Sequence, residues 1–367
     1  MADTQLDPAV PTFGTIWKLR IAAIIWFLLI AGCLLALPTL VDATVLLVIA
    51  AALLSFALGA GLAWLYRKFR QASDHGFLHD WLKAALATFC VLCITMAAPV
   101  YYFAMRTAAD PPLLPRAVLT NGQKTVVFQG MMHIGTQQFY KQVVFDLEQA
   151  LADGYVLYYE GVQPNPKGDK WFSDTLAGGG DLSANYTALS KLCGLKFQSD
   201  YFGLLQADQR EHPERHVIGD VDTWQMQQEF ERLKRDDPEF AAKIDAELSA
   251  KNADQGSGPM NSPVTALNQL TDGQLKLMGY FCRNQASNVI RTEQEPNQLK
   301  KVILNFRNQA LVRQMLSDPH DKIYVTYGAE HLKGVFALLR KADPRWRIES
   351  VTWTTPIAAP QQLEGEL

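Results

Sequence analysis

Three long uncharged runs of apolar residues occupy much of the first 110 residues and constrain the fold more than any other feature. They cover residues 21–40, 43–66 and 84–105. Each is long enough to cross a hydrocarbon core of about 30 Å as a helix. Core helices rarely stay uncharged over such lengths, so we expect a membrane region at residues 1–110 with three transmembrane helices. The first run is too long, and too closely followed by the second, for a cleaved signal peptide.

The cations beside these runs predict the orientation of the helices. They are Lys18 and Arg20 before the first run, and Arg67, Lys68, Arg70 and Lys83 between the second and the third. Cytoplasmic segments of membrane proteins carry an excess of Lys and Arg. With three helices both basic segments lie on one side, so the pattern predicts a multi-pass protein of the inner (plasma) membrane with a cytoplasmic N-terminus. Everything after Arg106 is then periplasmic or extracellular.

The composition beyond Arg106 is that of an ordinary globular domain. We expect a Pro-rich linker at residues 111–123, an α/β domain at 124–357 and a tail at 358–367. The formal net charge is -3, and no Lys/Arg cluster with interleaved aromatic residues occurs in this part. Nucleic acid is therefore not an expected partner. Membrane lipid is expected around the three helices.

The five cysteines fall into two groups. Cys33, Cys90 and Cys93 lie in the apolar runs, where cysteine usually acts as a small buried residue. Cys193 and Cys282 lie in the globular part. In an oxidising periplasm these two would form a disulfide, and a pair of free buried thiols is the alternative.

The globular part begins with a strand-helix-strand pattern. Residues 124–129 are mostly β-branched or aromatic and end at Gly130, residues 137–151 carry apolar side chains at helical spacing, and residues 155–159 are apolar up to Glu160. Such a unit predicts parallel strands with a crossover helix, within a mixed or parallel sheet flanked by helices. Residues 224–314 favour helices, and two further strands are expected at 322–327 and 348–352.

One short motif occurs twice, each time between an expected strand and an expected helix. The copies are Gly130-Met131-Met132-His133 and Gly328-Ala329-Glu330-His331. A glycine at the end of a strand lets the chain turn sharply, so the histidine is directed out of the sheet. Ligands gather beyond the carboxyl ends of parallel strands. We therefore expect His133 and His331 to meet Glu160 there, although a lone histidine after a strand is more often structural.

A further carboxylate is expected at the same edge of the sheet. Residues 217–222 favour a short strand that carries Asp220 and Asp222. One of these two alternatively caps the helix that starts at Thr223. Arg307, in a late helix, either clamps a substrate carboxylate or oxyanion, or pairs with Glu160.

Imidazole and carboxylate groups together suit a divalent metal such as Mn, Co or Zn. We predict His133, Glu160, His331 and Asp220 as metal ligands. A metal held in this way acidifies bound water and polarises a carbonyl group, which is what amide hydrolysis requires. The expected catalytic residues are His133, Glu160, Arg307 and His331.

These residues resemble the TraB/GumN/Tiki family, which has two Gly-x-x-His motifs, a Glu after the second strand and an Arg-Asn pair in a late helix. The matching residues are Gly130, His133, Glu160, Arg307, Asn308, Gly328 and His331, with the trailing Leu332-Lys333-Gly334. The resemblance extends from Thr125 to Leu339 and does not reach the apolar runs. Met131 stands where the family usually has a small residue, and Glu330 where Gly is common.

The resemblance implies an α/β fold shared with erythromycin-esterase-like and haem-binding ChaN-like proteins, and the Mn- or Co-dependent protease activity of Tiki proteins. The sequence therefore predicts a membrane-anchored, metal-dependent hydrolase of peptides or proteins. One alternative is a module that captures a peptide or haem in the same crevice without turnover. Another is a degenerate domain that serves assembly of a membrane complex.

Overall fold

A computed structural model describes residues 13–69, 76–176, 182–256, 270–292 and 297–358. The chain divides into two compact units. One comprises Met1–Phe103 and Thr271–Leu277, and the other comprises Ala104–Leu270 and Met278–Leu367. We call them the membrane unit and the globular unit and describe each by itself.

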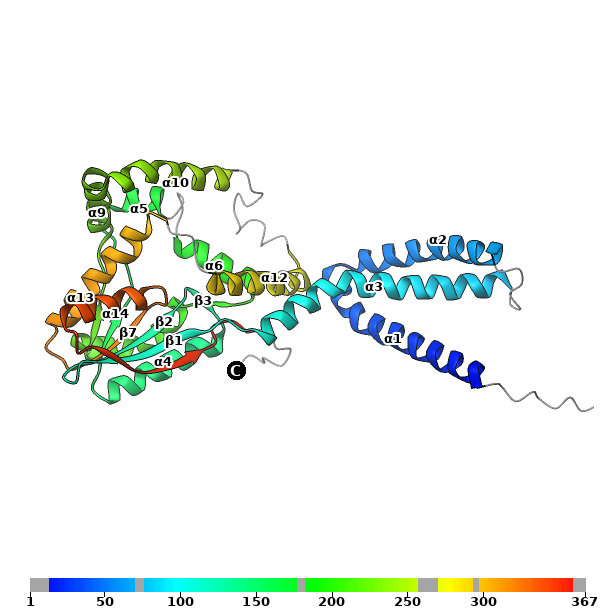
Figure 1. Cartoon of the computed structure of the whole chain (residues 1–367), viewed down its shortest axis with the longest axis horizontal. Helices are drawn as coiled ribbons and strands as arrows, with labels where there is room; N and C mark the ends of the chain where they lie inside the picture. The colour runs from blue at the N-terminus through cyan, green and yellow to red at the C-terminus, as the bar shows by residue number, and fades with distance from the viewer. Residues whose placement is uncertain (1–12, 70–75, 177–181, 257–269, 293–296, 359–367) are drawn as a thin grey trace, which may run out of the picture. The chain divides into compact units, whose positions relative to one another are not determined.

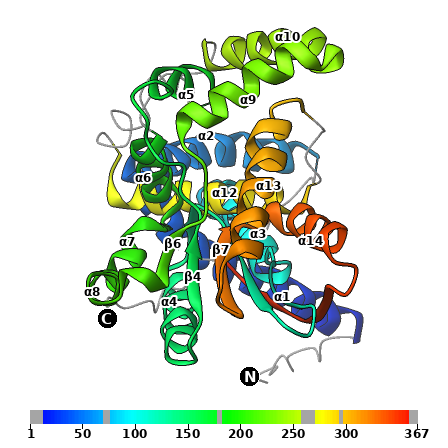
Figure 2. The same cartoon turned by 90° about the vertical axis from the view of Figure 1, so that its left-hand side faces the viewer.

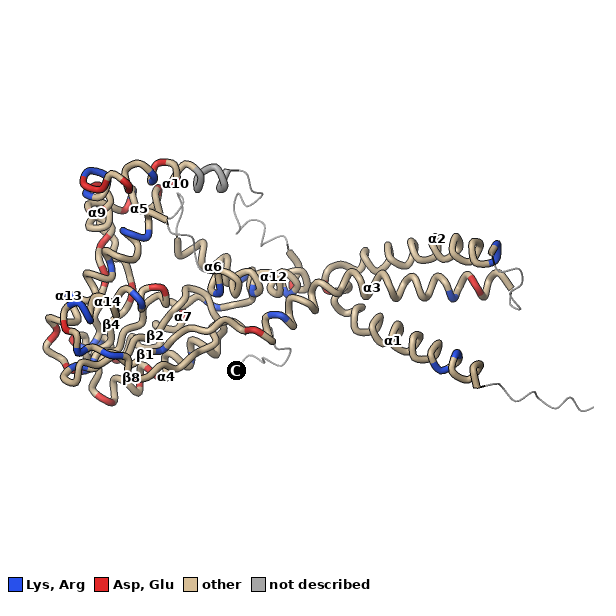
Figure 3. Tube along the Cα trace, in the orientation of Figure 1, with Lys and Arg blue, Asp and Glu red and all other residues tan. Residues whose placement is uncertain are grey.

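The three apolar runs form the helices α1 (Phe13–Ala43), α2 (Val45–Phe69) and α3 (Phe77–Ala109), and all but the last residues of α3, from Ala104 on, belong to the membrane unit. Within the described residues, these three helices are long and apolar enough to cross a membrane, which confirms this part of the prediction. Figure 3 shows how few charged residues interrupt them. The helices exceed the predicted bounds because they continue into the flanking polar residues. Helix α1 continues past Pro38 to Ala43.

Small side chains allow these helices to approach closely. The buried positions of α2 recur every four residues, at Ala51, Ser55, Gly59 and Ala63. A Cβ atom at Gly59 would lie 2.6 Å from the backbone nitrogen of Ala85 in α3. Helices in lipid associate through such stripes of small residues. Three thiols take the same role between α1 and α3, at Cys33, Cys90 and Cys93.

A mixed sheet forms the centre of the globular unit. Over the described residues its strand order is β6-β4-β7-β2-β1-β8. The strands are β1 (Leu114–Thr120), β2 (Thr125–Met131), β4 (Val156–Tyr159), β6 (His216–Ile218), β7 (Lys322–Gly328) and β8 (Arg347–Thr354). Strands β2, β7, β4 and β6 are parallel, whereas β1 is antiparallel to both β2 and β8. A mixed α/β sheet was one of the two predicted arrangements.

The predicted linker at 111–123 is instead largely strand β1. This strand pairs with β2 on one side and with β8 on the other, and it buries Leu114, Ala117 and Leu119. The Pro-rich start of the segment suggested a linker. Pro115 is nevertheless accommodated because it lies near the beginning of the strand, where a missing N–H is tolerated.

Helices cover both faces of the sheet (Figures 1 and 2). On one face, α4 (Gln137–Ala152) packs Phe139, Val143 and Leu147 against β2, β4 and β7. On the other face, α13 (Arg307–Ser317) and α14 (His331–Ala342) pack apolar side chains such as Leu311 and Val335.

The remaining elements surround this core. They are α5 (Asp169–Thr175), α6 (Leu182–Cys193), α7 (Ser199–Phe202), α8 (Gln206–Glu211), α9 (Thr223–Asp236), α10 (Pro238–Gly256), α12 (Asp272–Arg291), the two-stranded pair β3 (Ile134–Gly135) and β5 (Lys196–Phe197), the 3-10 turns η1 (Gly203–Leu205) and η2 (Pro213–Arg215), and the π-helical turn η3 (Lys301–Phe306). The helices of the stretch 224–314 agree with the helical pattern of the sequence.

A disulfide joins α6 to α12 in the globular unit. It links Cys193 and Cys282, whose Cα atoms lie 4.9 Å apart. The neighbouring Arg283 is buried and donates from Nε to the carbonyl oxygen of Cys193 at 2.9 Å and from Nη1 to that of Ala358 at 2.9 Å. The C-terminal end of α6 is therefore held by one covalent bond and by a buried guanidinium group.

Candidate functional site

The predicted site residues come from the carboxyl ends of four parallel strands. His133 follows β2, Glu160 follows β4, Asp220 follows β6, and His331 begins α14 just after β7. Arg307 is the first residue of α13 and follows the π-helical turn η3. π-helical turns are frequent at functional sites.

Arg307 lies at the centre of a buried network of charges. Its Nε donates to Asp220 Oδ1 at 2.9 Å, and its Nη2 donates to Glu160 Oε1 at 2.7 Å and also to Asp220 Oδ2. The side chains of Arg307, Glu160 and Asp220 are 7%, 16% and 0% exposed. Burial lowers the pKa of Arg307, but the two carboxylates outweigh it and raise the pKa above its ordinary value.

Asp220 binds Arg307 and the backbone with both carboxylate oxygens. Besides the guanidinium, it accepts hydrogen bonds from Gly161 N–H at 3.0 Å and Val221 N–H at 2.8 Å. Burial raises the pKa of Asp220, yet the hydrogen bonds and charge of Arg307 bring it below the ordinary value. Both carboxylate oxygens of Asp220 are thus bound by Arg307 and by backbone N–H groups. Asp222 is the residue that caps α9, together with Gln225.

Glu160 is held as a carboxylate. Its Oε2 accepts from Gly328 N–H at 2.5 Å, while Oε1 accepts from Arg307. Burial raises the pKa of Glu160, but Arg307, then His331 and His133, lower it below the ordinary value. A Cβ atom at position 328 would lie 3.3 Å from Glu160 Oε2. The glycine of the second motif therefore lets the carboxylate approach the chain closely.

His331 is buried and neutral near pH 7. Burial lowers the pKa of His331 to about 4, and the charge of Arg307 adds to this effect. Its Nδ1 donates to Asn308 Oδ1 at 2.7 Å, which leaves a lone pair on Nε2. Asn308 fits there because residue 334 is glycine, since a Cβ atom at that position would lie 2.3 Å from Asn308 Nδ2. The Tyr327 ring packs nearly perpendicular to the imidazole, with the two ring centroids 4.7 Å apart.

His133 is held by two residues that the sequence did not single out. Its Nδ1 lies 3.0 Å from Gln198 Nε2, and its ring packs on Tyr186 with centroids 4.3 Å apart. Burial lowers the pKa of His133, Glu160 opposes the shift, and Arg307 adds to it. His133 is therefore close enough to feel both charges. With the Gln198 amide in this orientation, Nδ1 accepts and the proton of the neutral ring lies on Nε2.

His331 and Glu160 present two acceptors to each other. Nε2 of His331 and Oε1 of Glu160 lie 3.8 Å apart. Neither atom has a proton to offer, because the imidazole proton lies on Nδ1 and the carboxylate is ionised. A water that donates a hydrogen bond to each atom, or a cation that both atoms coordinate, would satisfy this pair.

The fit of the site to a divalent metal is partial. Imidazole nitrogen and carboxylate oxygen are suitable ligands, and Nδ1 of His331 donates to the Asn308 side chain, which leaves Nε2 free for an ion. Nδ1 of His133 accepts from Gln198 instead, so its Nε2 carries the proton. As the side chains lie, however, the described part of the chain contains no group of three or more His, Cys, Asp or Glu that could hold an ion. A complete site would require movement of His133.

No protein-family model, curated protein or solved structure matches this chain. The function is therefore inferred from the site residues themselves. The sequence motifs located His133, Glu160, Arg307 and His331, and the resemblance located Asn308. Gln198 and Tyr186 carry no signal in the sequence, because they belong to neither strand-end motif.

Proposed function

We propose that this chain is a membrane-anchored hydrolase of peptides or proteins, related to the TraB/GumN/Tiki proteins. The observation that carries the proposal is the arrangement of both motif histidines around one ionised carboxylate at the carboxyl edge of a parallel sheet. The unprotonated Nε2 of a neutral imidazole and an ionised carboxylate can both accept a proton from water and so activate it.

In this proposal a water molecule lies between His331 Nε2 and Glu160 Oε1. One of these two atoms takes a proton from the water as the water oxygen attacks the carbonyl carbon of a peptide bond. The N–H of His133 Nε2 is a donor for the carbonyl oxygen as negative charge develops there. Arg307 is a positioning residue, since its charge keeps Glu160 ionised and its N–H groups fix the carboxylate. The proton taken up from water then passes to the leaving amine.

As the alternative, we propose that a divalent ion (Mn, Co or Zn) takes the place of this water between His331 and Glu160. These two residues would hold it, and His133 would join them once its side chain moved closer and the Gln198 amide turned its oxygen towards Nδ1. Such an ion, when bound, acidifies water and polarises a carbonyl group. The two acceptors 3.8 Å apart support this part of the proposal.

We also propose that the globular unit lies in the periplasm or outside the cell. The basic residues near the start of α1 and those around the end of α2 and the start of α3 favour this orientation. The disulfide between Cys193 and Cys282 supports it, since disulfides persist in oxidising compartments.

The test is peptide turnover by the full-length protein in detergent. A library of internally quenched peptides is incubated with Mn, Co or Zn, or with a chelator. We expect cleavage that is lost in His133→Ala, Glu160→Ala and His331→Ala and kept in His320→Ala, which changes an exposed histidine on the loop before β7. Turnover that survives all three site changes contradicts the proposal. Peptide binding without turnover, or a Soret band on titration with haemin, would instead favour the capture alternative.

A further inference from the structure

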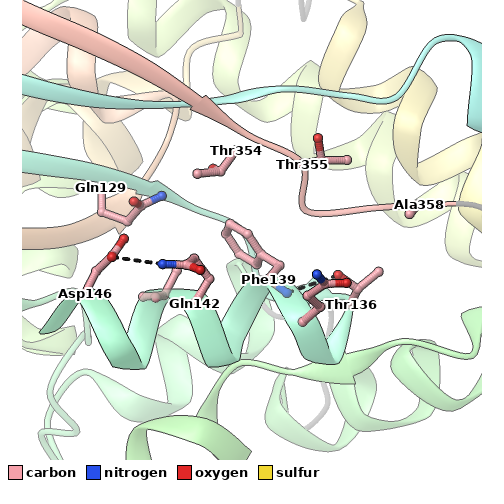
Figure 4. A pocket seen from close by; sticks show the side chains of 10 residues that line it. Gln129, Thr136, Phe139, Gln142, Asp146, Thr354, Thr355 and Ala358 are labelled. Atoms are coloured by element: carbon pink, nitrogen blue, oxygen red, sulfur yellow. Dashed lines mark hydrogen bonds between the residues drawn. The ribbon is translucent and has the colours of Figure 1, made fainter. Parts of the chain in front are cut away.

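A second pocket lies on the α4 face of the sheet. Its volume is about 300 Å³, and it is bounded by α4, the end of β2 and the segment that follows β8. Figure 4 shows the side chains that line it. None of the lining residues belongs to the site described above. The volume is at the lower end of the range for small-molecule pockets.

Gln129 brings an unused hydrogen-bond acceptor to this pocket. The residue is fully buried, and its Nε2 donates to the carbonyl oxygen of Gly130 at 3.0 Å. Its Oε1 is buried and has no hydrogen-bond partner. The opposite amide orientation would direct the oxygen at the Gly130 carbonyl, so the orientation is fixed. A buried amide oxygen without a partner costs stability, and this cost is removed when a ligand supplies the donor.

A second acceptor faces the first one. In Figure 4 the Gln129 amide and the Asp146 carboxylate point towards one another from β2 and α4. Asp146 accepts from Gln142 Nε2 at 3.0 Å, and Arg116 Nη1 lies 3.3 Å from its other oxygen. The Arg116 charge therefore balances that of Asp146. Gln129 Oε1 is therefore the acceptor at this end of the pocket that still lacks an N–H donor.

We propose that this pocket binds a small molecule that presents an NH2 group on a short branched apolar group. The NH2 group, of a primary amide or a primary ammonium, donates to Gln129 Oε1 and to Asp146. The apolar group lies against the side of the pocket that Phe139, Val143 and Ala358 provide. The proposal does not depend on hydrolysis at the other site.

The probes are isobutyramide, isobutylammonium and isobutyrate, which share one apolar group. Binding is measured by calorimetry on the full-length protein in detergent. We expect the amide or the ammonium to bind, and isobutyrate, which has no N–H, to bind at least tenfold more weakly. The preferred probe shows whether the natural ligand is neutral or charged.

Two variants assign the binding to this pocket. Gln129→Met has a similar shape and no acceptor, so we expect affinity for the preferred probe to fall about tenfold, as for one lost hydrogen bond. Gln123→Met makes the same change in an exposed turn and should leave affinity unchanged. Asp146→Asn, an independent change in case Gln129→Met does not fold, should weaken ammonium binding more than amide binding. Failure of every probe to bind, equal binding of isobutyrate, or unchanged affinity in the pocket variants would overturn the proposal.

Discussion

Removing the charge of Arg307 should destabilise the globular unit strongly. Arg307→Met leaves Asp220, whose side chain is fully buried, and Glu160 without their counter-charge. Breaking a buried ion pair from one side costs about 3–5 kcal/mol. For a unit of this size each kcal/mol lowers the melting temperature by about 2–4 °C. We therefore expect a loss on the order of 10 °C, because the Asp220 side chain is fully buried and the Glu160 side chain is only 16% exposed.

The assay is thermal unfolding of the full-length protein in detergent, followed by tryptophan fluorescence. The matched control is Lys170→Met, which removes an exposed cation paired with Asp174 and should cost under about 1 kcal/mol. Combining Arg307→Met with Asp220→Asn and Glu160→Gln should recover much of the loss, because the uncompensated charges disappear. The reasoning is refuted if Arg307→Met unfolds no earlier than the control, or if the triple variant is less stable than the single one.

Three further predictions concern pH, the disulfide and the membrane. The pKa of His331 is about 4 in the fold and near 6.5 in the unfolded chain, so stability should fall by on the order of 3 kcal/mol as the pH drops through this window; in chelator, His331→Gln should flatten that pH dependence. Cys282→Ser should cost about 2–4 kcal/mol of stability. In the unaltered protein, alkylation of the denatured chain should label three thiols without reductant and five with it. A reporter fused after Leu367 should be active outside the cytoplasm, and a cytoplasmic signal would contradict the proposed orientation.

The patterns with a clear period could be predicted from the sequence. The uncharged runs predicted α1, α2 and α3, and alternating strand and helix patterns predicted β2, α4, β4, β7 and α14 to within a few residues. Strand β1 was missed because its proline-rich start resembles a linker, and its pairing with β8 depends on a strand more than 200 residues away in the chain. Strand β6 ends at Ile218, earlier than predicted, because Asp220 leaves the sheet to bind Arg307.

The candidate site could be predicted only as far as strand ends could be found. His133, Glu160 and His331 each follow a parallel strand, so topology brings them to one edge. The partners of the histidines could not all be predicted in the same way. Tyr186 reaches His133 from α6 and Gln198 reaches it from the turn before α7, and their positions depend on packing that no local pattern encodes. The role of Asp220 depends on Arg307, 87 residues later in the chain.

The most direct test of the central claim is metal-dependent thermal stabilisation of the full-length protein. Melting temperatures are measured with a chelator and with Mn, Co or Zn, and metal content is determined after gel filtration. Specific binding raises the melting temperature in proportion to the logarithm of metal concentration over its dissociation constant. We expect one bound ion, lost in both His133→Ala and His331→Ala and kept in His320→Ala. Stabilisation that survives in either site variant, or that is absent in the unaltered protein, would contradict a metal site shared by the two histidines.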